Sequence, residues 1–165
     1  MTDTLIPAEI YELAARVVSE NAAQGRKLVL AESCTGGLVA SALTEVAGSS
    51  AVLEASFVTY SNAMKSRMLG VPADIIDTFG AVSVACAWAM AQGALKHSDA
   101  DVAVAISGIA GPDGGSAQKP VGLVVFAKAV RGSDEVLAEE RQFAPTSRAA
   151  VRAEAVKVAL ELLLP

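Results

Sequence analysis

The feature that most constrains the fold is the alternation of short apolar runs with longer segments of helical periodicity. Residues 27–31 (Lys-Leu-Val-Leu-Ala) read as a buried strand, and the residues before them repeat apolar side chains at helical spacing up to Gly25. The expected strands are 27–31, 51–60, 101–107, 121–130 and 135–143. The expected helices are 7–24, 35–48, 61–69, 72–79, 83–97 and 146–163.

Strands that alternate with helices are typical of an α/β fold, in which helices cover both faces of a largely parallel sheet. The last two strands are separated only by residues 131–134, which predicts a hairpin and therefore some antiparallel pairing. With 165 residues the chain is long enough to bury a core, and aromatic residues make up only 4%, so that core must consist of Ala, Val, Leu and Ile. We predict a single domain over 1–165, a three-layer α/β/α sandwich with a mixed, mostly parallel sheet.

Charge and composition argue against several classes of partner. The formal net charge is -5, the basic residues are scattered and aromatic residues are few, so we expect no nucleic-acid partner. No apolar run approaches ~18–20 residues, and residues 1–9 lack the pattern of a signal peptide, so we expect no membrane contact. The two cysteines, Cys34 and Cys86, are read as reduced thiols, which favours a cytoplasmic location. A phosphorylated small molecule remains compatible with an acidic chain, because backbone amides can bind an anion.

Small polar residues and glycines gather at the junctions between the expected elements. The four stretches are 32–37, 60–65, 80–83 and 107–115. In an α/β fold the carboxyl ends of the parallel strands meet at one edge of the sheet, where ligands bind. We therefore expect a substrate cleft at this edge.

Ser33 lies where the first expected strand ends and a helix begins. There its hydroxyl can act as a nucleophile while the backbone amides of Cys34, Thr35 or Gly36 form an oxyanion hole. A single such donor typically contributes about 2.7–4 kcal/mol to catalysis. The alternative is that Ser33 merely caps the following helix, which requires no chemistry.

The base that activates Ser33 is predicted to be a lysine. His97, the single histidine, lies near the expected end of a helix and away from the glycine-rich stretches, so neither a Ser-His-Asp triad nor a histidine metal site is expected. Lys65 follows the second strand at the proposed cleft, and a hydrogen bond from the Tyr60 hydroxyl can orient its amine. To act as a base, this lysine needs a pKa lowered to about 7–8. The alternatives are a solvated Lys65 and a half-buried structural Tyr60.

Two further features suggest a substrate-binding wall. Residues 107–115 (Ser-Gly-Ile-Ala-Gly-Pro-Asp-Gly-Gly) follow a strand, and their glycines permit close approach of backbone to a ligand, although Pro-Asp-Gly is also a common turn. Arg148 and Arg152 stand one helical turn apart near the start of the last helix, as in a phosphate clamp. The alternative for these arginines is surface ion pairing with neighbouring glutamates. Those glutamates are Glu139, Glu140 and Glu154.

Five stretches taken together resemble a known family, the C-terminal domain of the competence-induced protein CinA, which includes stand-alone nicotinamide mononucleotide deamidases. The stretches are 31–37, 57–65, 80–83, 107–115 and 119–122, and they occur in this order. The resemblance implies hydrolysis of the nicotinamide carboxamide to nicotinate mononucleotide and ammonia, without a metal or cofactor. It also implies Ser33 as nucleophile, Lys65 as base, Tyr60 as an assisting group, and homo-oligomers.

The expected site therefore has three parts: the catalytic group just named, an oxyanion hole formed by the amides of Thr35 and Gly36, and a substrate-binding set. The substrate-binding set is Cys34, Gly37, Ser61, Asn62, Ser107, Gly108, Gly111, Arg148 and Arg152. Many relatives carry an additional N-terminal domain that resembles molybdopterin-binding proteins, and 165 residues leave no room for it, so its pyrophosphatase activity is not expected. Two other functions remain open: a non-catalytic nucleotide-binding or competence-related module, and a hydrolase of another small amide.

Overall fold

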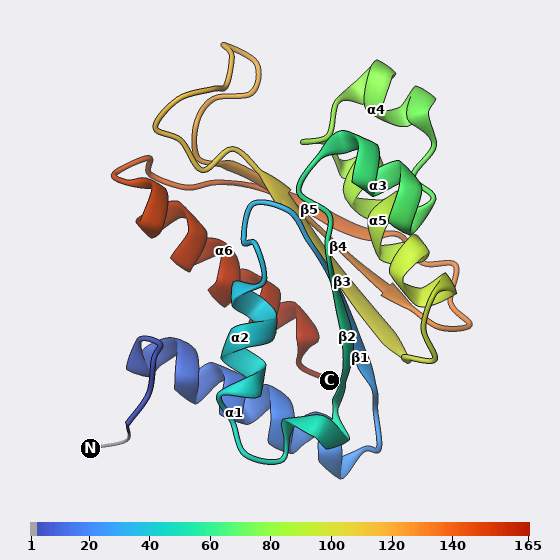
Figure 1. The fold of residues 1–165 in the computed structure, drawn as a ribbon, viewed down its shortest axis with the longest axis vertical. Helices are drawn as coiled ribbons and strands as arrows, with labels where there is room; N and C mark the ends of the chain where they lie inside the picture. The colour runs from blue at the N-terminus through green and yellow to red at the C-terminus, as the bar shows by residue number, and fades with distance from the viewer. Residues whose placement is uncertain (1–2) are drawn as a thin grey trace.

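The computed structural model describes residues 3–165, and Figure 1 shows their arrangement. The strands are β1 (Leu28–Glu32), β2 (Leu53–Val58), β3 (Val102–Gly108), β4 (Leu123–Val130) and β5 (Leu137–Gln142). The helices are α1 (Ala8–Ala23), α2 (Leu38–Thr44), the short 3-10 helix η1 (Ser49–Ala51), α3 (Asn62–Leu69), α4 (Ala73–Phe79), α5 (Val84–Lys96) and α6 (Arg148–Leu163). None of the helices in this part of the chain is long and apolar enough to cross a membrane.

The strands form one mixed sheet in the order β2-β1-β3-β4-β5. Strand β1 pairs in parallel with both β2 and β3, whereas β4 runs antiparallel to both β3 and β5. The predicted mixed sheet is confirmed, and its parallel part is the half formed by β2, β1 and β3. This half matters for function, because the carboxyl ends of its strands lie at the same edge.

Helices cover both faces of the sheet, as predicted for a three-layer sandwich (Figure 1). Helices α1, α2 and α6 lie on one face, and α3, α4 and α5 lie on the other. Side chains of β1 alternate between the two layers: Leu28 and Leu30 pack with the first group of helices, and Val29 and Ala31 pack with the second. Each helical layer therefore has its own core, with the sheet between them.

The second helix begins later than its periodicity predicts. Residues 35–48 were expected to be helical, but α2 spans Leu38–Thr44, and a turn occupies the preceding residues. Gly36 and Gly37 have φ values of 58° and 96°, in the left-handed region that glycine adopts at little cost. The two glycines therefore separate Ser33 from the helix and give it a turn of its own.

Candidate active site

A cleft of ≈ 320 Å³ opens at the edge where β1, β2 and β3 end. Many of the residues expected in the site line it. These are Ser33, Cys34, Tyr60, Asn62, Lys65, Ser107, Gly108, Gly111 and Arg148. Hydrogen bonds join the three strand ends, because the Ser33 amide donates to the Ile106 carbonyl and the Thr59 amide donates to the Glu32 carbonyl. The parallel strands thus bring residues from distant parts of the sequence together.

Ser33 is almost buried, with 7% of its surface exposed, and it belongs to a tight turn. The Gly36 amide closes this turn by donating to the Ser33 carbonyl at 3.0 Å. Within residues 3–165, the amides of Cys34 and Thr35 donate to no other residue. The capping alternative for Ser33 does not fit, because α2 begins at Leu38 and its N-cap is Gly37. The assignment of Gly36 to the oxyanion hole needs correction as well, since its amide already has an acceptor.

Glu32 holds this turn to α2, a role that the sequence analysis did not assign. Its side chain is fully buried, and Oε2 accepts hydrogen bonds from the Thr35 hydroxyl at 2.7 Å and from the Gly37 and Val39 amides at 3.0 and 3.1 Å. Oε1 accepts from the Ala40 amide at 3.1 Å and from the Ser56 hydroxyl at 3.0 Å. A carboxylate that ends an apolar strand and precedes a helix was the signal that sequence reasoning missed.

Thr35 was expected at the oxyanion hole and Gly37 in the substrate-binding set. The Thr35 hydroxyl and the Gly37 amide instead donate hydrogen bonds to Glu32. Neither residue lines the cleft. For Thr35 this concerns the hydroxyl alone, and its main-chain amide remains without an acceptor in the described part of the chain.

Lys65 lies on the buried side of α3, and its side chain is 1% exposed. Its Nζ lies 2.9 Å from Ser33 Oγ, 2.9 Å from the Thr59 carbonyl and 3.4 Å from the Tyr60 carbonyl. The alternative of a solvated lysine is therefore wrong. These three contacts match the three protons of an ammonium group. They equally match a neutral amine that donates to two carbonyls and accepts from the serine hydroxyl.

Burial lowers the pKa of Lys65 below its ordinary value of 10.5, because a charged ammonium loses solvation in the closed site. The direction is the one that a general base requires. The same burial raises the pKa of the Cys34 thiol to about 11. Cys34 therefore remains protonated near neutral pH, and Ser33 is the nucleophile candidate in this turn that a base contacts directly.

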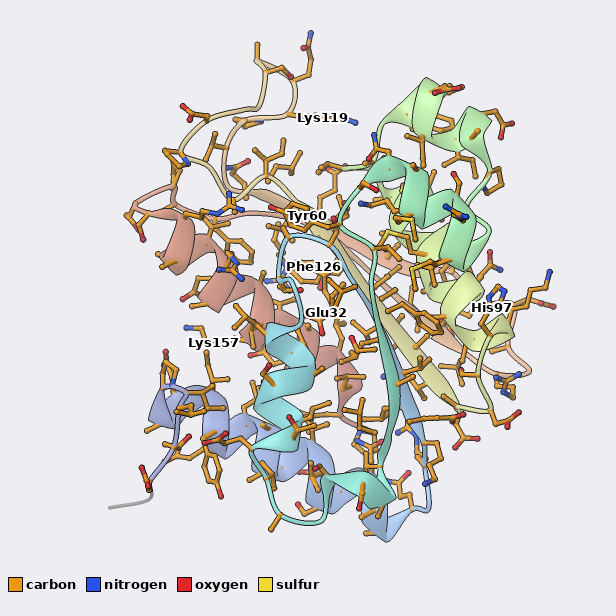
Figure 2. The ribbon with its side chains drawn as sticks, in the orientation of Figure 1. Glu32, Tyr60, His97, Lys119, Phe126 and Lys157 are labelled. Atoms are coloured by element: carbon orange, nitrogen blue, oxygen red, sulfur yellow. The ribbon has the colours of Figure 1, made fainter. Side chains whose placement is uncertain are left out.

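Tyr60 is placed differently from its prediction. Its hydroxyl accepts a hydrogen bond from Arg148 Nη2 at 2.8 Å, and its side chain is 60% exposed at the end of the sheet (Figure 2). Lys65 contacts Tyr60 through the main-chain carbonyl instead. The hydroxyl does not orient the lysine amine, so that part of the prediction is corrected.

The two arginines of α6 have separate roles. Arg148 lines the cleft, and its Nη1 donates to the Gly111 carbonyl at 2.7 Å. Arg152 instead donates from Nε to the Cys34 carbonyl at 3.0 Å and from Nη2 to the Thr35 carbonyl at 3.2 Å. The predicted two-arginine clamp is thus wrong for Arg152, which does not line the cleft. Neither arginine forms an ion pair within the described residues, so the surface alternative does not fit either.

Two predicted residues remain: Ser61 caps a helix, and Ser107 lines the cleft. Ser61 is the N-cap of α3 and accepts from the Met64 amide at 3.2 Å, and it is not among the residues that line the cleft. Ser107 is buried and donates to the Ala81 carbonyl at 2.9 Å, which joins two walls of the cleft. Ala81, Val82 and Asp113 also line these walls, and they belong to the stretches 80–83 and 107–115 that were expected at the cleft.

His97 lies at the far end of α5, away from Tyr60 (Figure 2), and its Nδ1 is 2.8 Å from the Gly93 carbonyl. Within residues 3–165 no group of three or more His, Cys, Asp or Glu side chains is arranged to hold a metal ion.

Comparison with known proteins gives consistent matches. The model of the CinA C-terminal domain matches residues 10–165. The nicotinamide-nucleotide amidohydrolase PncC of Enterobacter agglomerans is 48% identical over 156 residues, which cover 94% of this chain and 93% of that protein. A CinA-like protein of Mycolicibacterium vanbaalenii is 46% identical over 158 residues, and the match covers 94% of this chain but 37% of that longer protein.

A solved structure gives the same result for the fold. The competence/damage inducible protein CihA from Agrobacterium tumefaciens superposes with a TM-score of 0.94 at 51% identity, covering 97% of this chain and 96% of that chain. The match by family model extends over nearly the whole sequence and includes all the strand ends that form the cleft. The chain belongs to the CinA C-terminal domain family.

Proposed function

We propose that this protein is a cytoplasmic amidohydrolase that converts nicotinamide mononucleotide to nicotinate mononucleotide and ammonia. The observation that carries the proposal is the 2.9 Å contact between Lys65 Nζ and Ser33 Oγ inside the cleft. The name of the Enterobacter agglomerans relative, a nicotinamide-nucleotide amidohydrolase, supports the choice of substrate. Assembly into homo-oligomers stays a prediction.

The first half-reaction forms an acyl-enzyme. Neutral Lys65 accepts the hydroxyl proton of Ser33 as Oγ attacks the carboxamide carbon. During this step the carbonyls of Thr59 and Tyr60 keep the amine in place. The carbonyl oxygen of the substrate becomes an oxyanion, and we assign its binding to the amides of Cys34 and Thr35, which have no acceptor within residues 3–165. The C–N bond then breaks, and Lys65 returns the proton so that ammonia leaves.

The second half-reaction releases the product. Water attacks the acyl carbon while Lys65 takes its proton, and collapse of the intermediate returns that proton to Ser33 Oγ. The products are nicotinate mononucleotide and a free serine, so atoms and protons balance. No metal or cofactor takes part in these proposed steps.

Arg148 is the cation that we assign to the substrate phosphate. It lies at the wall of the cleft, where the Gly111 carbonyl and the Tyr60 hydroxyl hold two of its nitrogens. A guanidinium fixed in this way presents a planar donor group to an anion, as phosphate sites often require. The loop from Ser107 to Gly115 supplies the facing backbone.

The test is ammonia release from nicotinamide mononucleotide by purified protein. Ser33→Ala should lower kcat by about 10⁴-fold or more, as expected when a catalytic nucleophile is removed. Ser19→Ala is the matched control, because that exposed serine on α1 donates to the Arg16 carbonyl on its own helix. Full activity in Ser33→Ala would refute the nucleophile.

Two alternative functions give different results in the same assay. A non-catalytic nucleotide-binding or competence-related module would bind the nucleotide without releasing ammonia. A hydrolase of another small amide would leave nicotinamide mononucleotide intact and release ammonia from a different carboxamide in a Ser33-dependent reaction.

A further inference from the structure

Arg152 contacts the turn of Ser33 without lining the cleft, and its two hydrogen bonds go to main-chain carbonyls. The guanidinium is partly buried and lies close to Gly36, where an added Cβ would be 3.5 Å from Nη2. One side chain from α6 thus spans the three residues that follow the nucleophile. Its contacts suggest a purpose other than binding the substrate.

The peptide between Cys34 and Thr35 is the important one. Nε of Arg152 donates to its carbonyl oxygen, and its N–H is the Thr35 amide, which donates to no other residue within 3–165. This peptide is trans, since the cis bond of the described chain is Gly111–Pro112. In a trans peptide the carbonyl and the N–H point in opposite directions. Arg152 therefore fixes the direction of the Thr35 N–H, which points away from the guanidinium.

The second hydrogen bond acts on the neighbouring peptide. Nη2 donates to the Thr35 carbonyl, and the N–H of that same peptide, at Gly36, donates to the Ser33 carbonyl. The Ser33 carbonyl in turn belongs to the peptide whose N–H is the Cys34 amide. A positive charge at one end of such a chain polarises each peptide and strengthens the donors beyond it. Both amides without acceptors, at Cys34 and Thr35, thus belong to peptides whose carbonyls are hydrogen-bonded.

We propose that Arg152 is a positioning residue that orients and polarises the backbone oxyanion hole next to Ser33. This inference rests on the proposed function for its substrate but concerns the acylation step itself. The guanidinium touches neither the substrate nor the reacting atoms. It lowers the barrier because the amides are already aligned when the oxyanion forms.

The test measures acylation in two ways, namely ammonia release from nicotinamide mononucleotide and acetylation of Ser33 by p-nitrophenyl acetate, followed by intact mass. Removing an oxyanion donor outright costs about 10²–10³ in kcat, so losing its alignment should cost about 10–100-fold. Arg152→Ala should therefore lower kcat and the acetylation rate by this factor while KM changes less than about 3-fold. Arg152→Lys, whose ammonium cannot donate in the same fork, should be intermediate.

Lys157→Gln is the matched control for charge loss on the same helix, because Lys157 pairs with Glu9 and Glu154 and lies away from Tyr60 (Figure 2). It should leave both rates unchanged. Millimolar guanidinium should restore part of the lost rate in Arg152→Ala and none in Ser33→Ala. Restoration by a free guanidinium separates positioning from simple loss of folding, which the added ion would not repair.

Several results would overturn the inference. The first is acetylation of Arg152→Ala at the wild-type rate, and the second is a rise in KM of this variant with unchanged kcat. The third is a loss of rate in Arg152→Ala that neither added guanidinium nor the Arg152→Lys replacement restores. If the wild-type chain is acetylated at Ser33 but releases no ammonia from nicotinamide mononucleotide, the proposed substrate is wrong and Arg152 is still judged by acetylation. If Ser33 of the wild-type chain is not acetylated either, both the nucleophile and the role of Arg152 are refuted.

Discussion

Replacing Glu32 with Gln keeps the shape of the side chain but turns one acceptor oxygen into an NH₂ donor. In the least disruptive orientation the NH₂ takes the place of Oε1, which has two donors, because Oε2 has three. The Ser56 hydroxyl can then turn to accept a proton. The Ala40 amide cannot, and it is left facing another donor.

The size of the effect follows from these contacts. An unsatisfied buried amide costs about 1–3 kcal/mol, and each remaining hydrogen bond weakens when its acceptor loses a negative charge. Burial of a neutral amide is in turn less costly than burial of a carboxylate, which offsets part of the loss. We expect Glu32→Gln to lower the free energy of unfolding by about 2–4 kcal/mol.

Urea denaturation measures this change as a shift in midpoint at an unchanged slope. Glu54→Gln is the matched control, since Glu54 accepts one exposed hydrogen bond, from the Asp99 amide at 2.9 Å. It should change stability by less than about 0.5 kcal/mol. A loss below about 0.5 kcal/mol in Glu32→Gln would refute the view that this carboxylate holds the turn of Ser33 to α2.

Four further predictions concern other parts of the structure. Because the pKa of Lys65 is lowered below 10.5, kcat/KM should rise with pH through that lowered pKa, and a pH-rate profile that is flat or falls there would contradict its role as base. Between the lowered pKa and 10.5 the unfolded chain binds more protons than the folded chain, so the free energy of unfolding should also rise with pH, as denaturation at several pH values can measure. Tyr60→Phe removes an anchor of Arg148 and should raise KM more than it lowers kcat, and a fall in kcat alone would restore the predicted role of the hydroxyl. Gly93→Ala should lower the free energy of unfolding by about 2 kcal/mol or more, because the new Cβ would lie 2.0 Å from the Leu69 carbonyl oxygen. Replacing glycine by alanine within a helix usually stabilises instead. Thermal unfolding, with Gln92→Ala as control, would show the sign of the change.

The layers and the cleft could be predicted from the sequence because they depend on local patterns. Apolar runs and helical spacing indicated the strands and helices, and the rule that parallel strand ends share an edge brought Ser33 and Lys65 together. The 2.9 Å contact between their side chains agrees with that expectation. The depth of the burial of Lys65 could not be predicted, since it depends on how α3 packs against α5.

The roles of individual polar groups were harder to predict. Arg148 and Arg152 share a helix face and looked equivalent, but the turn after Ser33 presents carbonyls to only one of them. Glu32 was overlooked because its five partners come from α2 and β2 as well as from its own turn. A pattern within one segment cannot reveal which donors a distant segment brings to it.

The proposed catalytic pair, Ser33 and Lys65, is divided between the two helical layers. Ser33 is held by Glu32 and α2 on one side of the sheet and by Arg152 of α6 on that same side, whereas Lys65 belongs to α3 on the other. We expect partial unfolding of either layer alone to separate Ser33 from Lys65 before the sheet itself is lost. Enzymatic activity should therefore report the integrity of both layers at once, and it should disappear at lower denaturant concentration than the far-ultraviolet signal of the whole chain.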